Sequence, residues 1–116
     1  MPLPVINRVA RQYQTEDGKM PFREWLIGLR DGRAQAKITK AITQMEAGNF
    51  GDHKALTNAN GLYERRIDYG PGYRIYYIVE GNTVIVLFCG SDKSDQKRMI
   101  KQAKSYLQNY KSRKMK

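Results

Sequence analysis

Two regions in the first half of the chain carry apolar residues at the spacing of an amphipathic helix. The first follows Pro21, which suits the first position of a helix, and it ends at Asp31-Gly32. The second spans 33–47, and Gly48 after it is a natural C-cap. The apolar residues recur at intervals of three and four: Phe22, Trp25, Leu26 and Leu29, then Ile38, Ala41, Ile42 and Met45. We therefore predict a helical hairpin whose apolar stripes pack against another element.

In the second half, apolar residues follow the pattern of strands. Three antiparallel strands are predicted, at 63–69, 73–80 and 83–89. The last two are joined by Gly81-Asn82, a two-residue hairpin turn that pairs Glu80 with Thr83. The third strand is apolar on both faces, so it should lie in the centre of the sheet.

A less regular strand is predicted at 5–14, and the segment 49–61 is loop by composition. A C-terminal helix follows the last strand, and its stripe is Met99, Ile100, Ala103 and Leu107. Its N-cap candidates are Ser91, Asp92 and Ser94. This order predicts an α+β fold: a small antiparallel β-sheet with an N-terminal helical hairpin and a C-terminal helix. The economical arrangement packs the helices on one face and leaves the other face for function.

Strand alternation predicts which arginines share a face of the sheet. A three-residue loop at Gly70–Gly72 places Arg66 opposite Tyr76, on the same face as Arg74. Arg65 then points toward the core and extends its charged end to an edge. A loop of two or four residues would put Arg65 on the face of Arg74 instead.

The net charge of +10 is high for 116 residues. We expect one domain over 1–110 and a basic, flexible tail over 111–116. Four basic residues lie in that tail, so the rest still carries 17 basic against 11 acidic residues. Such a charge favours nucleic acid or another acidic partner, although a basic surface also serves solubility.

Several classes of protein are not favoured by the sequence. The single cysteine, Cys89, allows no disulfide within the chain and lies in an apolar run, which is typical of a buried structural thiol. No signal peptide and no apolar run of about 18 residues is evident, so we expect a cytoplasmic protein with no membrane association. No metal-ligand cluster and no cofactor is expected. His53 can be a general base or a solvated loop residue.

The functional face is predicted to contain Arg66, Arg74 and Tyr76, with Lys93 just beyond the central strand. Two fixed guanidinium groups near a tyrosine can hold a phosphate and stabilise charge that develops on it. Further nucleic-acid contacts are assigned to four residues: Lys54, Arg65, Gln96 and Lys97. The alternative is that the arginines only form ion pairs with Glu64, Asp68 and Glu80.

The segments GLYERRIDYGPGYRIYY and VIVLFCGSDKSDQ, followed by a lysine-rich helix, resemble the RelE/ParE superfamily of toxins. The resemblance covers about 22–110 and is strongest to the HigB-like, phage-derived "addiction module killer" branch. It implies a small antiparallel sheet flanked by helices. It also implies a ribosome-dependent mRNA endonuclease that is neutralised by a cognate antitoxin, usually of helix-turn-helix type.

The same resemblance assigns roles to individual residues. Arg74 matches the phosphate-binding arginine of the family, Arg66 matches a basic position on the preceding strand, and Lys93 matches a further basic residue, with Gln96 in the same motif. The branch usually has leucine where this chain has Arg65. RelE itself has a lysine where this chain has Glu64, so the acid–base groups cannot be a copy of that lysine pair.

The resulting expectation is a type II toxin that arrests translation and growth. Cleavage would proceed without a metal, by attack of the ribose 2′-hydroxyl on the adjacent phosphate. Arg66 and Arg74 would stabilise charge, and Lys93 or Tyr76 would move a proton. Two alternatives remain open: a ParE-like inhibitor of DNA gyrase, and a nucleic-acid-binding module without chemistry.

Overall fold

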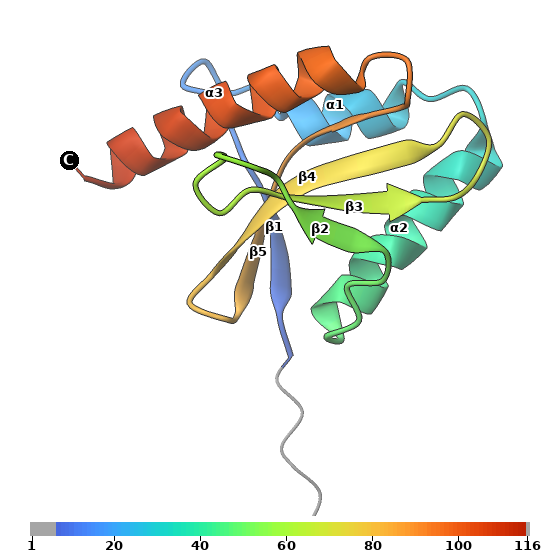
Figure 1. Ribbon diagram of the computed structural model, residues 1–116, viewed down its shortest axis with the longest axis horizontal. Helices are drawn as coiled ribbons and strands as arrows, with labels where there is room; N and C mark the ends of the chain where they lie inside the picture. The colour runs from blue at the N-terminus through green and yellow to red at the C-terminus, as the bar shows by residue number, and fades with distance from the viewer. Residues whose placement is uncertain (1–6, 116) are drawn as a thin grey trace, which may run out of the picture.

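Five strands form one sheet in the order β1-β5-β4-β3-β2 (Figure 1). The computed structural model describes residues 7–115. The strands are β1 (Val9–Gln12), β2 (His53–Ala55), β3 (Tyr63–Ile67), β4 (Tyr73–Glu80) and β5 (Val84–Ser91). The α+β class is as predicted. However, β1 pairs in parallel with β5, so the sheet is mixed, and β2 lies in a segment predicted to be loop.

The strand predicted at 5–14 is present as the shorter β1. Residues 5 and 6 of that prediction, and residue 116 of the predicted tail, lie outside the described residues.

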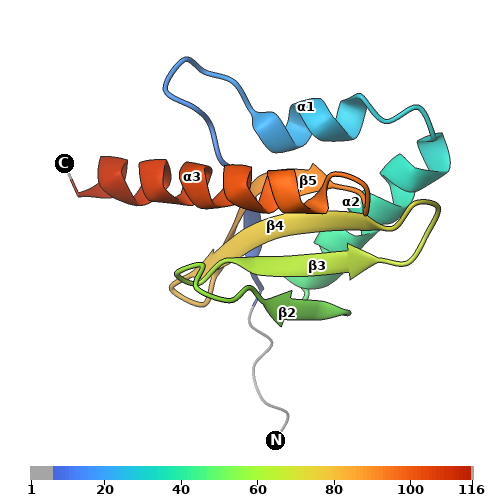
Figure 2. The same cartoon turned by 45° about the horizontal axis from the view of Figure 1, so that its top comes forward.

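Helices cover both faces of this sheet, whereas one free face was predicted (Figure 2). The helices are α1 (Pro21–Ile27), α2 (Gly32–Glu46) and α3 (Gln96–Lys114). On one face, Ala103 and Leu107 of α3 pack with alternate strand residues: Tyr76, Ile78, Val86 and Phe88. On the other face, Phe22 and Ile38 pack with the intervening ones: Ile75, Tyr77, Ile85 and Leu87. Both alternating sets are apolar, so both faces must be buried.

The pairing of the strands differs from the predicted register in two places. Arg66 lies opposite Arg74, and not opposite Tyr76, because the connection after β3 is longer than three residues. This shift is by two positions, so Arg66 and Arg74 still share a face. Between β4 and β5, Glu80 pairs with Val84, and a register irregularity follows between Tyr76 and Tyr77.

The N-cap of α2 is Asp31, whose side chain accepts hydrogen bonds from the backbone N–H groups of Arg33 and Ala34. The helix α3 begins at Gln96, later than the three N-cap candidates allow. Asp92 instead accepts hydrogen bonds from Ser94 within the preceding loop.

The Trp25 ring packs directly on Gly90 of β5. A Cβ added to Gly90 would lie 2.2 Å from the Trp25 ring, well inside contact distance. We predict that Gly90→Ala lowers the free energy of unfolding by about 2–3 kcal/mol, because the indole must move out of a packed position. Urea denaturation followed by Trp25 fluorescence and circular dichroism measures this. Gly32→Ala is the control, since a Cβ added there would have nothing within 4 Å and the stability should not fall.

The helix α3 continues to Lys114, beyond Tyr110, after which a flexible tail was predicted. Tyr110 donates a hydrogen bond to Glu80, and Lys114 forms an ion pair with the same carboxylate. The Arg113 guanidinium carbon lies 5.4 Å from the centre of the Tyr13 ring. The last basic residues therefore hold the helix end against the body of the protein.

The Glu80 contacts give stability that depends on pH. Hydrogen bonds from Lys114 and Tyr110 lower the pKa of the Glu80 carboxyl below its ordinary value of 4.5. The stabilisation is therefore present above about pH 4.5 and disappears as pH falls through the folded-state pKa. We predict that Glu80→Gln costs about 0.5 kcal/mol near neutral pH, and almost nothing in strong acid, because the pair is partly exposed. Thermal melts of both proteins across this pH range measure the difference.

Candidate functional site

The site is organised around Arg66 and Arg74, which lie directly opposite each other on β3 and β4. Both are on the face that α3 covers, at the end of the sheet near the start of that helix. A pocket of about 480 Å³ opens there between the end of β3, the following turn and the segment after β5. Its lining residues are Asp52, Arg66, Ile67, Asp68, Gly70, Pro71, Gly72, Tyr73, Arg74 and Lys93.

One buried carboxylate holds both arginines. Glu64 is fully buried, and its Oε1 and Oε2 atoms lie 3.3 Å from Arg74 Nε and 3.5 Å from Arg66 Nε, respectively. Gln96 donates a hydrogen bond of 2.8 Å from Nε2 to Glu64 Oε1. The start of α3 therefore fixes the carboxylate, which in turn fixes the two guanidinium groups. The alternative that these arginines form ion pairs with Glu64 is thus realised in the structure.

Glu64 alone does not neutralise the two arginines, although the exposed carboxylates of Asp52 and Asp68 also line the pocket. Glu64 supplies one negative charge against the two positive charges of Arg66 and Arg74. Arg74 is only 7% exposed and donates from Nη1 to the Gly72 carbonyl at 2.7 Å, so it is held rigidly at the pocket wall. The Arg66 side chain is 39% exposed and reaches solvent. The arrangement presents one fixed and one accessible cation to an anion in the pocket.

Lys93 joins this pocket from a different part of the chain. It lies just after β5, and its backbone N–H donates to the Pro71 carbonyl at 3.4 Å. Its side chain passes Gly72, with Lys93 Cγ 3.7 Å from where a Cβ at Gly72 would be. The prediction that Lys93 lies beside Arg66 and Arg74 is confirmed as a matter of position. The lysine is exposed, so its charge is free to meet a ligand.

Of the other predicted contacts, two are exposed cations near the arginines and one has a structural role. Lys54 is exposed on the edge strand β2 and pairs with Glu64, so it belongs to the same face as the arginines. Lys97 is exposed on the first turn of α3, next to Gln96. Gln96 itself is used to hold Glu64, which makes it a positioning residue.

Tyr76 is not available as a proton-transfer group. It is fully buried, and its hydroxyl is hydrogen-bonded to Ser91 Oγ at 2.8 Å. Burial raises the pKa of the Tyr76 phenol, which disfavours its ionised form. Tyr76 does face the arginine side of the sheet, as predicted, but α3 covers it there. Its assignment as a catalytic residue is therefore wrong.

Arg65 is not an RNA contact either. It is 9% exposed, pairs with Ile75 on β4, and donates from Nη2 to Gln44 Oε1 of α2 at 3.2 Å. The Gly51 backbone lies over its guanidinium group, and a Cβ there would be only 1.6 Å from Arg65 Nη1. The predicted coreward direction of Arg65 is confirmed, but its charged end is buried under this loop and does not reach an exposed edge.

Two further candidates lie outside the arginine pocket. His53 pairs with Arg65, so it is on the opposite face, where its ring lies 6.0 Å from Phe50 and 6.2 Å from Tyr63. It cannot serve as a base for a ligand at Arg66 and Arg74. Cys89 is buried, and burial raises the pKa of its thiol to about 12, in keeping with a structural role. Among residues 7–115, no three His, Cys, Asp or Glu side chains gather as metal ligands do.

Comparison with known proteins gives a relative but no activity. No family model matches the chain. An uncharacterized protein of Haemophilus influenzae (strain Rd) is 45% identical over 85 residues, which span 73% of this chain and 84% of the relative. The chain belongs to the same family as this protein. Between residues 7 and 115, the chain contains no helix that is long and apolar enough to cross a membrane.

Three polar residues that line the arginine pocket were not predicted as site residues. Asp52 lines the pocket, and its carbonyl accepts a 2.7 Å hydrogen bond from the Arg66 backbone N–H. Tyr73 and Asp68 line it as well. Tyr73 is adjacent to Arg74 in the sequence, so its nearness to the site could have been inferred from that position. Asp52 lies in a segment without periodicity, so its place depends on how β2 pairs with β3.

Proposed function

We propose that the chain is the toxin of a type II toxin–antitoxin system, a HigB-like member of the RelE/ParE superfamily that cleaves mRNA on the ribosome. The observation that carries the proposal is the opposed Arg66–Arg74 pair, fixed from behind by buried Glu64 at a pocket that also receives Lys93. Such a set of cations, of which Arg74 is held in place by burial, suits a transition state that gains negative charge at a phosphate.

The reaction needs no group beyond RNA and protein side chains. The 2′-oxygen forms a bond to the adjacent phosphorus, and the bond from phosphorus to the 5′-oxygen of the next nucleotide breaks. The products are a 2′,3′-cyclic phosphate and a free 5′-hydroxyl. Arg66 and Arg74 stabilise the charge on the non-bridging oxygens. In this proposal Lys93 protonates the leaving 5′-oxygen, and Asp52 and Asp68, whose carboxylates line the same pocket, are the candidate bases for the 2′-hydroxyl.

The partners in this proposal are the ribosome, its mRNA and a cognate antitoxin. A net charge of +10 suits all three, because RNA is anionic and a neutralising protein gains affinity from an acidic segment. The antitoxin is expected to be a helix-turn-helix protein encoded beside the toxin. The site of action is the cytoplasm, and no cofactor takes part.

Primer extension on cellular mRNA after brief expression tests the proposal. Cuts at defined codon positions, formed only while translation proceeds, are the expected result. Intact transcripts together with growth arrest and trapped gyrase–DNA breaks would identify a gyrase inhibitor instead. Intact transcripts without such breaks would leave a nucleic-acid-binding module and exclude the nuclease.

A further inference from the structure

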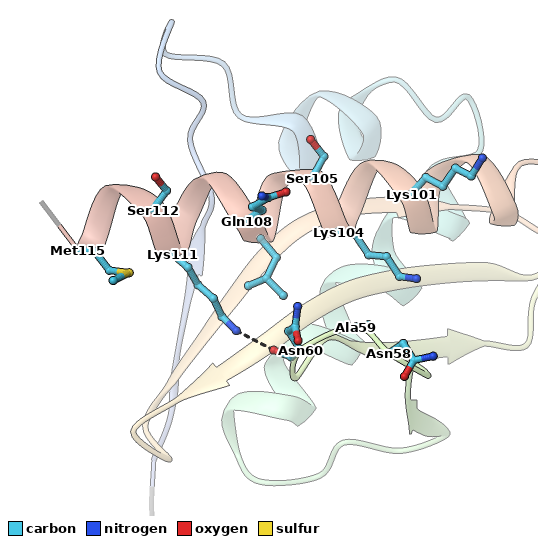
Figure 3. A pocket seen from close by; sticks show the side chains of 11 residues that line it. Asn58, Ala59, Asn60, Lys101, Lys104, Ser105, Gln108, Lys111, Ser112 and Met115 are labelled. Carbon is cyan, nitrogen blue, oxygen red and sulfur yellow. Dashed lines mark hydrogen bonds between the residues drawn. The ribbon is translucent and has the colours of Figure 1, made fainter.

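A second hollow, a groove between α3 and the turn at 58–60, lies away from the arginine pocket (Figure 3). It measures about 900 Å³. Its lining residues are Asn58, Ala59, Asn60, Lys101, Lys104, Ser105, Leu107, Gln108, Lys111, Ser112 and Met115. Three of these are lysines, and none is acidic or aromatic. The hollow therefore offers positive charge and polar groups without a surface on which bases can stack.

The groove is formed by defined contacts. The Lys111 ammonium donates a 2.9 Å hydrogen bond to the Asn60 carbonyl, and Figure 3 shows this contact joining α3 to the turn. Asn58 and Asn60 both adopt positive φ, at 53° and 54°, and these left-handed residues shape the turn. Lys101 and Lys104 are exposed and, with Lys111, supply its charge.

The lysines of the groove continue along α3 toward the arginine pocket. Lys97 precedes Lys101 by four residues, so the two lie on one side of α3 with Lys104 and Lys111. At 1.5 Å per residue, the row from Lys97 to Lys111 is about 21 Å long. Its first member follows Gln96, which is bonded to Glu64 at the arginine site. Another hollow, lined by Lys93, Lys97 and Arg98, adjoins the arginine pocket, and its carboxylate, Asp95, is paired with Arg98. Basic residues therefore extend from the arginine pocket to the row on α3.

We infer that this lysine row is a track for the phosphate backbone of single-stranded RNA that leads away from the arginine pocket. The inference rests on the proposed function, because it assigns a path to the same substrate. Four ammonium groups over this length supply the positive charge that neutralises several phosphates of a nucleic-acid strand. The lining contains no ring for base stacking, so binding here should be independent of sequence. An acidic protein segment is the competing occupant, and it has no need of continuity with the arginine pocket.

The test measures binding and not cleavage. The probe is a fluorescein-labelled oligouridylate of about 12 nucleotides with 2′-O-methyl riboses, which removes the nucleophile. The variant is Lys101→Gln/Lys104→Gln/Lys111→Gln. The control removes the same charge elsewhere, as Lys19→Gln/Lys37→Gln/Lys40→Gln, because these three lysines are exposed and lie outside the groove. Fluorescence anisotropy is recorded from about 50 to 200 mM salt.

The groove variant should bind roughly 30- to 100-fold more weakly at about 0.1 M salt, and its plot of log K against log salt should be shallower by about 2. The control should retain both values within a small factor. Equal losses in the two variants would overturn the track, since net charge alone would explain them. Unchanged binding by the groove variant would also overturn the track, and an acidic protein segment would then be the better candidate for the groove. Absence of binding by the parent protein at the lowest salt would overturn the track as well. Because the probe cannot be cut, none of these outcomes depends on whether the protein cleaves mRNA.

Discussion

Replacing Arg74 by lysine should strongly reduce mRNA cleavage and relieve growth arrest while the protein stays folded. Arg74 pairs through Nε with Glu64 and donates from Nη1 to the Gly72 carbonyl, while the guanidinium group lines the pocket. A lysine can keep the ion pair, but its compact ammonium group lacks the planar fork that lets a guanidinium face a carboxylate with one edge and a phosphate with another. We expect cleavage to fall by about 10²- to 10³-fold, the usual effect of removing one group that stabilises a developing oxyanion.

Lysine is preferred over alanine here because Arg74 is buried beside a buried carboxylate. Alanine would leave Glu64 with a weaker counterion and could unfold the protein, so lost activity would have no clear cause. The matched control is Arg65→Lys, which alters a buried arginine on the same sheet but on the opposite face. Primer extension should show parental cleavage for the control. Parental cleavage by a folded Arg74→Lys protein would show that the site is elsewhere.

The sequence predicted the position of Arg66 and Arg74 well because alternation tolerates some errors. The connection between β3 and β4 is longer than expected, so the register was wrong by two residues. A shift of two returns every side chain to its original face. The pairing of these arginines was therefore wrong in detail, and their common face was right.

Tyr76 illustrates what alternation cannot supply. Its face was predicted correctly, yet Tyr76 is buried under α3 and bonded to Ser91. The strand β5 is apolar on both faces, which was interpreted only as a sign of a central strand, although it is also what a sheet covered on both faces requires. Which part of a face remains open depends on where α3 begins, and local pattern does not determine that. The helix starts at Gln96, so it covers Tyr76 and leaves the ends of Arg66 and Lys93 accessible.

Arg65 and Asp52 show a second limit, which concerns long-range contacts. The position of Arg65 depends on Gln44 of α2 and on the loop at Gly51, both remote in sequence or without periodicity. Asp52 reaches the pocket because the adjacent strand β2 pairs with β3. Neither contact leaves a local signal in the sequence. The burial of the Arg65 guanidinium group and the place of Asp52 at the pocket could therefore be identified only in the folded structure.

Replacing Glu64 by alanine should destabilise the fold more than any surface change. The carboxylate is fully buried and pairs with Arg66 and Arg74, and Arg74 is itself buried. Removing it leaves buried positive charge without a counterion, which costs about 3–5 kcal/mol in free energy of unfolding. Urea denaturation measures this loss, and Glu80→Gln is the control for removal of a partly exposed acid.

A double-mutant cycle made of Glu64→Leu, Arg74→Met and the double variant then separates the contribution of the ion pair from that of packing. Glu64→Leu/Arg74→Met replaces both buried charges by apolar groups and should recover most of the lost stability, because the charge that remains, Arg66, is partly exposed and can be solvated. The coupling free energy between the two sites should then be about 3 kcal/mol or more, because the double variant loses far less than the sum of the two single losses. The recovered protein should still fail to cleave mRNA, since the arginine that we propose to bind the phosphate is gone. Additive losses in the double variant would show that Glu64 does not hold Arg74, and the positioning role assigned to Glu64 would then be wrong.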